Sequence, residues 1–355
     1  MEKFNISFII LGLGLPYLLI NFLLLKKFSI FQKKISTIGD DRWGDSNKSH
    51  LGGVIFFVNF CLSFAIYFYS TDLLNLNNID PEQKKIIALF CAINIGFFAG
   101  LLDEIEVLPP FTKILTQFFA SLFFIFGNII INVTGIYLID IALTSLFFIF
   151  LINIVNIFDN IDMGLAAPMS IIFLFFYSLG IYNFDNFYSF MLIMMLLSLM
   201  VFMVYNFSPS KLFMGDLGSF QLGIILCFFL IEKIFELDFI SFSHNANFFM
   251  NILILTLIIP LFIYDFIFVF FRRILKKKNP FKGDANHLSH NLFKKFKSAN
   301  IVSFIFVLIQ TLSLLLALHI INHFKNPLDE ILKIIAFHLV ASILLYFLSK
   351  KIITR

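Results

Sequence analysis

Charged residues are scarce in this chain. Lysine, arginine, aspartate and glutamate make up only 14% of its 355 residues, whereas 60% are hydrophobic, and the mean hydropathy is +0.94. A soluble globular protein could not hide so much apolar surface from water, so this class of protein is excluded. We therefore expect an all-α integral membrane protein, a polytopic bundle that forms a single domain over residues 1–355.

Cysteine is also rare. The three cysteines, Cys61, Cys91 and Cys227, all lie within apolar runs, where cysteine is more often a small buried hydrophobe than a disulfide or a metal ligand. The first apolar run, residues 4–25, is long enough to span a membrane and is followed by two lysines, not by a small-residue cleavage site. We therefore expect no cleavable signal.

Long apolar segments recur through the whole chain. A membrane helix needs about 20 apolar residues, and on this measure we predict ten to eleven transmembrane helices. The predicted spans lie near residues 4–25, 51–70, 84–101, 114–133, 137–157, 167–181, 188–206, 216–233, 249–271, 300–321 and 331–349. Only a few residues separate the fourth span from the fifth, so this pair is the least secure part of the count.

Basic residues are distributed unevenly between alternate loops. Most of the 26 lysines and arginines fall in one set of loops, while the other set is comparatively acidic. Since loops rich in lysine and arginine stay in the cytoplasm, we expect the N-terminus outside and the C-terminus inside. Every unusual polar cluster then faces the cytoplasm, and we predict one composite site there. The clusters lie at residues 42–53, 103–113, 153–166, 209–216 and 282–297.

The segment from 153 to 166 carries the most regular polar pattern. Asn153, Asn156, Asp159 and Asp162 follow one another at intervals of three residues. At a helix end this spacing places side-chain oxygens on one side, where they suit a hard cation such as Mg²⁺. The alternative is a capped polar helix terminus, but four such residues exceed what a cap needs.

A second cluster follows the span at 84–101. Asp103 and Glu104 are adjacent carboxylates, and Lys113 lies a short distance along the chain. Adjacent carboxylates near a low-dielectric boundary repel unless a metal ion or a lysine balances them. One of them can then accept a proton or help to hold a metal. The alternative is a solvated acidic loop.

Two further clusters contain residues suited to ions or phosphates. Asp216 lies between two glycines, which let the backbone approach a ligand closely, although a helix cap is the alternative for this aspartate. His287 and His290 lie in the longest basic loop. Because no cysteine or third histidine completes a zinc site nearby, we expect them to bind phosphates or a sugar.

Two polar residues are assigned structural roles. His50 follows Lys48 closely and precedes a pair of glycines, and we expect it to be a satisfied interface histidine, not a catalyst. Asp265 lies inside the predicted span at 249–271, where an unpaired carboxylate is costly. We expect Asp265 to pair with an arginine and leave it out of the site.

Taken in order, these motifs resemble those of the polyprenyl-phosphate N-acetylhexosamine-1-phosphate transferases. The resemblance covers residues 48–290 and rests on four motifs. They are an acidic pair followed by Pro and Thr-Lys, Asn-x-x-Asn-x-x-Asp, Phe-Met-Gly-Asp-x-Gly-Ser, and a late histidine motif. The span count is more similar to the branch that initiates enterobacterial common antigen and the O-antigen of lipopolysaccharide than to the peptidoglycan enzyme.

The sequence departs from the family pattern at several positions. The usual second aspartate is Glu104, a third acidic position falls on Val107, Asn160 replaces a glycine, and Met163 interrupts an Asp-Gly-Leu-Ala run. Glutamate keeps the charge of aspartate but reaches further. These departures therefore bear on the fine geometry and the choice of sugar more than on the reaction class.

The resemblance implies a reaction at the bacterial inner membrane, with the active site facing the cytoplasm. A sugar-1-phosphate, expected to be an N-acetylhexosamine-1-phosphate, passes from a UDP-sugar to a polyprenyl phosphate such as undecaprenyl phosphate. UMP is released, and a cell-envelope glycan is begun. The implied cofactor is Mg²⁺, with Mn²⁺ as the alternative. The partners are the UDP-activated amino sugar, the lipid and the membrane, with no nucleic acid, and a homodimer is left open.

The resemblance also implies a role for individual residues. Asn156 and Asp216 would hold Mg²⁺, and Asp159 would complete the acidic site. Asp103 and Glu104 would orient or deprotonate the acceptor phosphate, and positioning is favoured because a phosphate monoester is already largely ionised at neutral pH. The residues expected to contact the substrates are Lys48, Lys113, His287 and His290.

A secondary transporter with an inner-side polar site is the main alternative. Transport sites lie near the bilayer midplane, within interrupted helices of matched repeats. Here the polar clusters lie at span ends and no internal repeat is evident. Asp103, Asp159 and Asp216 at mid-depth on opposing halves would favour transport. A phosphatidyl-alcohol transferase would need a longer acidic helix motif than residues 159–167 supply.

Overall fold

The chain is an all-α polytopic membrane protein, as its composition predicts. The computed structural model describes residues 21–27, 48–70, 79–180, 187–239, 244–275, 277 and 287–349. Within these ranges every regular element is helical, and none is a strand. Helices are expected in a membrane because they satisfy all their backbone hydrogen bonds internally.

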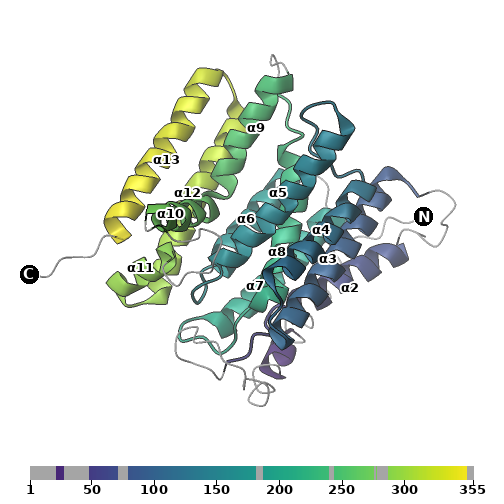
Figure 1. Ribbon diagram of the computed structural model, residues 1–355, viewed down its shortest axis with the longest axis vertical. Coiled ribbons are helices and arrows are strands. Elements are labelled where there is room, and N and C mark those ends of the chain that lie inside the picture. Colours follow the sequence, from purple (N-terminus) through teal and green to yellow (C-terminus); the bar gives the residue numbers. More distant parts are fainter. Residues whose placement is uncertain are drawn as a thin grey trace, which may run out of the picture. The chain divides into compact units, whose positions relative to one another are not determined.

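The described helices follow one another with short connections (Figure 1). Their bounds are α2 (Val54–Ser70), α3 (Pro81–Ile105), α4 (Pro110–Phe126), α5 (Tyr137–Phe158), α6 (Ala166–Leu179), α7 (Phe187–Asn206), α8 (Gly215–Phe229), the π-helical turn η3 (Leu230–Ile234), α9 (His244–Ile258), α10 (Pro260–Leu275), α11 (Leu288–Phe296), α12 (Ala299–His323) and α13 (Pro327–Ser349).

Six of the described helices are long and apolar enough to cross a membrane, namely α3, α5, α7, α8 with η3, α12 and α13. The bent pair of α9 and α10 would be a seventh span, and α2, α4 and α6 are shorter apolar helices. Each predicted span after the first corresponds to one of these helices or to the bent pair. The first, at 4–25, lies mostly outside the described residues.

The predicted span at 249–271 is not one continuous helix. Helices α9 and α10 meet at Pro260 with a bend of 85°. Proline has no N–H to donate and clashes with the preceding turn, but its fixed φ suits the first position of a new helix. The apolar segment therefore contains two helices that run in different directions.

The predicted end of the span at 114–133 is also wrong. Helix α4 ends at Phe126, and the next residues are Gly127 and Asn128, the latter with φ of 58°. The connection to α5 is held instead by Asp140, whose carboxylate accepts hydrogen bonds from the backbone N–H of Thr134 at 2.9 Å and of Val133 at 3.3 Å. Residues 129–134, which are rich in β-branched side chains, therefore form a tight connection and do not continue helix α4.

The chain divides into two compact units, which we describe separately. The first comprises residues 1–153 and 173–228, and the second comprises residues 154–172 and 229–355. Helices α5 and α6 are divided between them. The expected single domain over residues 1–355 stays a prediction.

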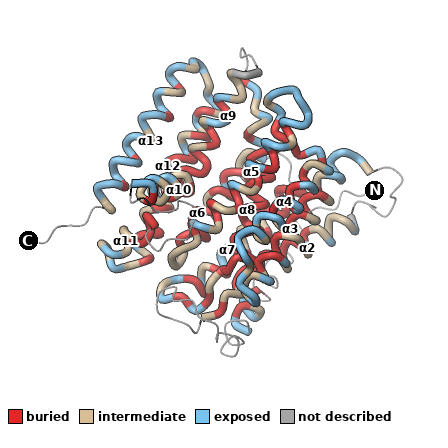
Figure 2. Tube along the Cα trace, in the orientation of Figure 1, coloured by how far each residue is buried: buried red, intermediate tan, exposed pale blue. Residues whose placement is uncertain are grey.

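In the first unit, helix α8 packs backbone to backbone against its neighbours. A Cβ atom added at Gly100 of α3 would overlap the backbone of Leu217, and one at Gly53 would overlap the backbone of Gly218. Glycine at such positions lets helices approach closely where lipid gives no hydrophobic drive for association. Nearly all of the span that begins at Gly215 is accordingly buried, as Figure 2 shows for α8.

In the second unit, α9, α12 and α13 lie side by side (Figure 1). His338 of α13 bonds both halves of the bent pair: its Nε2 lies 2.8 Å from the Thr256 hydroxyl of α9, and its Nδ1 lies 2.6 Å from the Tyr264 hydroxyl of α10. The buried rings of Phe158, Phe262 and Phe306 pack together. Polar contacts between helices thus fix the bend.

Gly100→Ala tests the close approach of α3 and α8. The added methyl group would push against the Leu217 backbone, so we expect a loss of stability of about 1–3 kcal/mol and reduced activity through displacement of Asp216. Thermal unfolding in detergent measures this. Gly180→Ala is the control, because a Cβ there would have no neighbour closer than 3.5 Å. Equal melting temperatures for the two variants would contradict the packing argument.

Candidate functional site

Four charged residues meet at one end of the first unit, where α3 ends and α4 and α8 begin. We call Asp103, Glu104, Lys113 and Asp216 the acid–lysine cluster. The Lys113 Nζ lies 2.6 Å from the Asp103 Oδ2 and 3.0 Å from the Asp216 Oδ2. The expected repulsion between neighbouring carboxylates is therefore balanced by a lysine. The consecutive helices α3 and α4 and the distant helix α8 contribute to this cluster.

The turn between α3 and α4 explains why Lys113 faces Asp103. The Asp103 Oδ1 accepts a hydrogen bond of 2.8 Å from the Leu108 backbone N–H, which closes the turn. Helix α4 then begins at Pro110, a residue favoured at the first helical position. Lys113 falls in the first helical turn, where a positive charge is unfavourable to the helix dipole. The two aspartates offset that cost.

Glu104 holds the beginning of α8. Its Oε1 accepts a hydrogen bond of 2.9 Å from the Asp216 backbone N–H, and its Oε2 lies 3.4 Å from the His50 Nδ1. A carboxylate is favourable at a helix N-terminus. The longer side chain of glutamate, compared with the usual aspartate, here joins two segments of backbone. His50, which also contacts the Phe213 ring edge-on, is the interface histidine that the sequence indicates.

Lys48 lies beside the loop that leads into Asp216. Residues 49–53 pair with residues 212–214 through backbone hydrogen bonds, among them Phe213 N–H to the Ser49 carbonyl at 2.7 Å and Gly53 N–H to the Met214 carbonyl at 2.9 Å. The Lys48 Nζ is 5.4 Å from the centre of the Phe213 ring, within range of a cation–π contact. Lys48 therefore belongs to the same unit as the acid–lysine cluster.

Gly215 makes this arrangement possible. Its φ is +74°, and an added Cβ would overlap the His50 carbonyl oxygen and lie 2.8 Å from the Glu104 Oε1. Only glycine adopts this conformation without strain and leaves room for both neighbours. The glycine before Asp216 therefore allows Glu104 to reach the helix, which is a different role from direct approach to a ligand.

The donor atoms of the acid–lysine cluster fit a divalent cation. Carboxylate oxygens of Asp103 and Asp216 already converge on one positive group, the Lys113 ammonium. Mg²⁺ typically binds one or two protein carboxylates and keeps water or substrate phosphates as its other ligands. Among the described residues no group of three or more acidic, histidine or cysteine side chains could hold a metal by itself. Binding of Mg²⁺ through one or two carboxylates does not require such a group.

The residues predicted from the Asn-x-x-Asn-x-x-Asp motif are divided between the two units. Asn153 belongs to the first unit and donates a hydrogen bond of 2.6 Å to Gln117 of α4, so it joins two helices. Asn156 lies near the end of α5, and Asp159 follows that helix with its N–H bonded to the Asn156 carbonyl at 3.1 Å. Both belong to the second unit. Their predicted meeting with Asp103 and Asp216 stays a prediction.

His287 and His290 lie together at the start of α11 in the second unit. The His287 Nδ1 is 2.8 Å from the Asp265 Oδ2, and the Asp265 Oδ1 accepts a hydrogen bond of 2.7 Å from the Leu288 N–H. The His287 backbone N–H donates to the His290 Nδ1 at 3.3 Å. The expected pairing of Asp265 with an arginine is therefore wrong. Asp265 is satisfied by the start of α11 instead.

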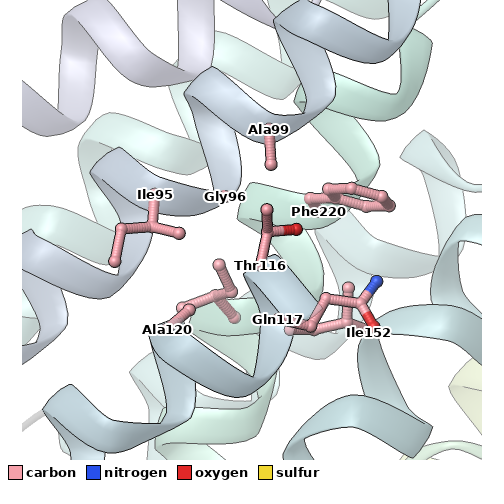
Figure 3. A pocket seen from close by; sticks show the side chains of 9 residues that line it. Ile95, Gly96, Ala99, Thr116, Gln117, Ala120, Ile152 and Phe220 are labelled. Atoms are coloured by element: carbon pink, nitrogen blue, oxygen red, sulfur yellow. The ribbon is translucent and has the colours of Figure 1, made fainter. Parts of the chain in front are cut away.

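A small cavity lies within the first unit among α3, α4, α5 and α8 (Figure 3). It is lined by apolar side chains with Thr116 and Gln117, and its volume of about 10 Å³ is that of one water molecule. A sugar nucleotide does not fit there. We therefore do not assign this cavity to a substrate.

Comparison with known proteins supports the motif-based resemblance. Residues 86–234 match the family model of glycosyl transferase family 4. The chain is 31% identical to the phospho-N-acetylmuramoyl-pentapeptide-transferase of Streptococcus uberis, over 62% of this chain and 71% of that protein. The chain belongs to the polyprenyl-phosphate hexosamine-1-phosphate transferase family. The expected family is thus confirmed.

Two other members of this family give similar matches. The Streptococcus agalactiae phospho-N-acetylmuramoyl-pentapeptide-transferase is 30% identical, over 54% of this chain and 64% of that protein. The probable undecaprenyl-phosphate N-acetylglucosaminyl 1-phosphate transferase of Bacillus subtilis is 30% identical, over 42% of this chain and 39% of that protein. The chain thus spans less than two thirds of these two relatives. The expected similarity to the O-antigen branch stays a prediction.

The family match contains the acid–lysine cluster together with Asn156 and Asp159, and it ends before His287. The acid–lysine cluster, Asn156 and Asp159 lie inside the matched segment. His287 and His290 lie outside it, and the structure describes them by their contacts with Asp265 and with each other. The roles of all these residues stay predictions.

Lys113→Met tests whether the lysine balances Asp103 and Asp216. Two carboxylates would remain close together at a largely buried position, and we expect a loss of stability of about 3 kcal/mol or more. Thermal unfolding of the purified protein measures it. Lys84→Met, at an exposed position in α3, is the control. Adding Asp103→Asn to Lys113→Met should recover part of the loss, and no recovery would refute the charge-balance explanation.

Glu104 variants separate a positioning role from a catalytic one. Glu104→Gln keeps an oxygen that can accept from the Asp216 N–H, whereas Glu104→Asp keeps the charge but is too short to reach both of its partners. We expect Glu104→Gln to retain more activity than Glu104→Asp, measured as the rate of nucleotide release under identical conditions. The reverse order would mean that the charge of Glu104 matters more than its reach.

Proposed function

We propose that this protein transfers an N-acetylhexosamine-1-phosphate from a UDP-sugar to a polyprenyl phosphate such as undecaprenyl phosphate. An oxygen of the acceptor phosphate forms a bond with the sugar-bearing phosphorus. The bond from that phosphorus to the bridging oxygen breaks, and its electron pair leaves with UMP. The product is a polyprenyl-diphosphate sugar, which begins a cell-envelope glycan. The named relatives support this class of reaction.

The observation that carries the proposal is the Lys113 ammonium held between the Asp103 and Asp216 carboxylates. Phosphoryl transfer needs positioned charges more than covalent participation by the protein. Two carboxylates contact this one lysine and Glu104 lies beside them, so acidic groups are in excess in the cluster. An anionic substrate would be repelled unless a further cation were bound, which favours a divalent metal ion as part of the working site.

We propose Mg²⁺, with Mn²⁺ as the alternative, held by Asp216 and Asp103 and, from the sequence motif, by Asn156. When bound, the ion would neutralise the charge that develops on the leaving phosphate. Lys113 would then be released from one aspartate to contact a phosphate oxygen. Asp103 would position the acceptor phosphate, Glu104 would fix the first turn of α8, and Asp159 would complete the acidic set.

The location of the cluster supports a transferase over a transporter. Asp103 lies near the end of α3, Lys113 in the first turn of α4, and Asp216 at the start of α8. Transport sites lie near the middle of the membrane, whereas a lipid phosphate is found at its surface. We propose that the site faces the cytoplasm at the bacterial inner membrane, where UDP-sugars are available, as the distribution of basic loops indicates.

An assay of UMP release tests the proposal. Purified protein, Mg²⁺, undecaprenyl phosphate and each of several UDP-N-acetylhexosamines should give release that depends on both the lipid and the metal. Asp216→Ala and Asn156→Ala should each abolish turnover, because they remove proposed metal ligands, while the protein stays folded in detergent. Activity retained in either variant would remove that residue from the metal site. Absence of release with every donor would refute the transferase.

A further inference from the structure

Asp265 is a buried carboxylate that the proposed reaction does not yet use. Its exposed fraction is 1%, and it lies in the second turn of α10, which begins at Pro260. Both of its oxygens are occupied: Oδ2 by the His287 Nδ1 at 2.8 Å, and Oδ1 by the Leu288 N–H at 2.7 Å. A carboxylate in an apolar span is costly to retain and marks a functional position by default.

The contact with Asp265 determines which nitrogen of His287 carries the proton. An ionised carboxylate can only accept hydrogen bonds, so Nδ1 of His287 must be the donor. The Nε2 is then the ring atom left for another group, while the His287 side chain also caps the first turn of α11. An acid that bonds one nitrogen of a histidine and so sets its tautomer is well known from catalytic triads.

A second observation points to a ligand at the same place. The Ser289 hydroxyl, in the first turn of α11, is buried with an exposed fraction of 1% and has no hydrogen-bond partner among the described residues. Backbone N–H groups at a helix start favour negatively charged ligands. The start of α11 therefore offers the His287 ring and the Ser289 hydroxyl, both suited to phosphate oxygens.

We propose that Asp265 is a positioning residue that holds His287 with its Nε2 directed to the phosphates of the sugar nucleotide. This inference rests on the proposed function, because it takes His287 as a contact of the UDP-sugar. It extends that function to a residue outside the motifs by which the family is recognised. Asp265 itself does not touch the substrate and acts only through His287.

Asp265→Asn is the decisive variant. The remaining Oδ1 can still accept from the Leu288 N–H, so α11 stays attached, while the amide no longer requires Nδ1–H of His287. We expect kcat to fall about 10- to 100-fold, as for other residues that orient a functional histidine through a hydrogen bond, with an unchanged KM for the polyprenyl phosphate. Tyr264→Phe is the matched control, because it removes a hydrogen bond to His338 from the adjacent position of the same helix.

Nitrogen NMR of labelled histidine tests the pairing without any substrate. The His287 signal, assigned with His287→Gln, should show Nδ1–H in the wild-type protein and in Tyr264→Phe. It should change in Asp265→Asn. An Nε2–H signature in the wild type would overturn the proposal even if the enzyme is active. If no variant and no donor gives UMP, the proposed function fails, and the NMR result still decides the pairing.

The double variant Asp265→Asn with His287→Gln separates positioning from a structural role. If Asp265 acts through His287, the double variant should be no slower than His287→Gln alone. Multiplied losses would mean that Asp265 acts independently, which overturns the proposal. A fall in melting temperature in Asp265→Asn that exceeds the fall in Tyr264→Phe and accounts for the lost activity would also overturn it.

Discussion

The balance of charge around Lys113 is the interaction on which the candidate site depends. Three carboxylates at the end of a membrane bundle would repel one another strongly in a medium of low dielectric constant. One ammonium shared by Asp103 and Asp216 relieves that repulsion, and the Glu104 carboxylate is stabilised separately by the N-terminus of α8. These contacts make the cluster stable as a protein structure. Because it remains acidic overall, it is still suited to a divalent cation.

Close packing of helix backbones keeps these charges in place. Gly100 lies one turn before Asp103 on α3 and contacts the backbone at Leu217, next to Asp216. The separation between the two aspartates is therefore set by the contact of α3 with α8 and not by flexible side chains. Fixed positions of charged side chains are what phosphoryl transfer requires, because its catalysis comes from positioning and electrostatics.

In the second unit, a buried acid is stabilised by different partners. Asp265 is satisfied by an imidazole and a backbone N–H, both from the start of α11. The bend at Pro260 and the contacts of His338 with Thr256 and Tyr264 fix the helix that carries it. The same carboxylate thereby joins α10 to α11 and orients His287. Two hydrogen bonds offset the free-energy cost of burying it in the membrane.

The sequence by itself determined the membrane class, the helical architecture and the family, because apolar length and motif order are local properties of the chain. The partners of charged groups cannot be read from the local sequence. Asp103 with Lys113 and Asp216, Glu104 with His50, and Asp265 with His287 were decided by which helix ends meet. The break at Pro260 was likewise decided by the tertiary structure, since proline in a membrane segment permits either a kink or a new helix, and only packing selects between them.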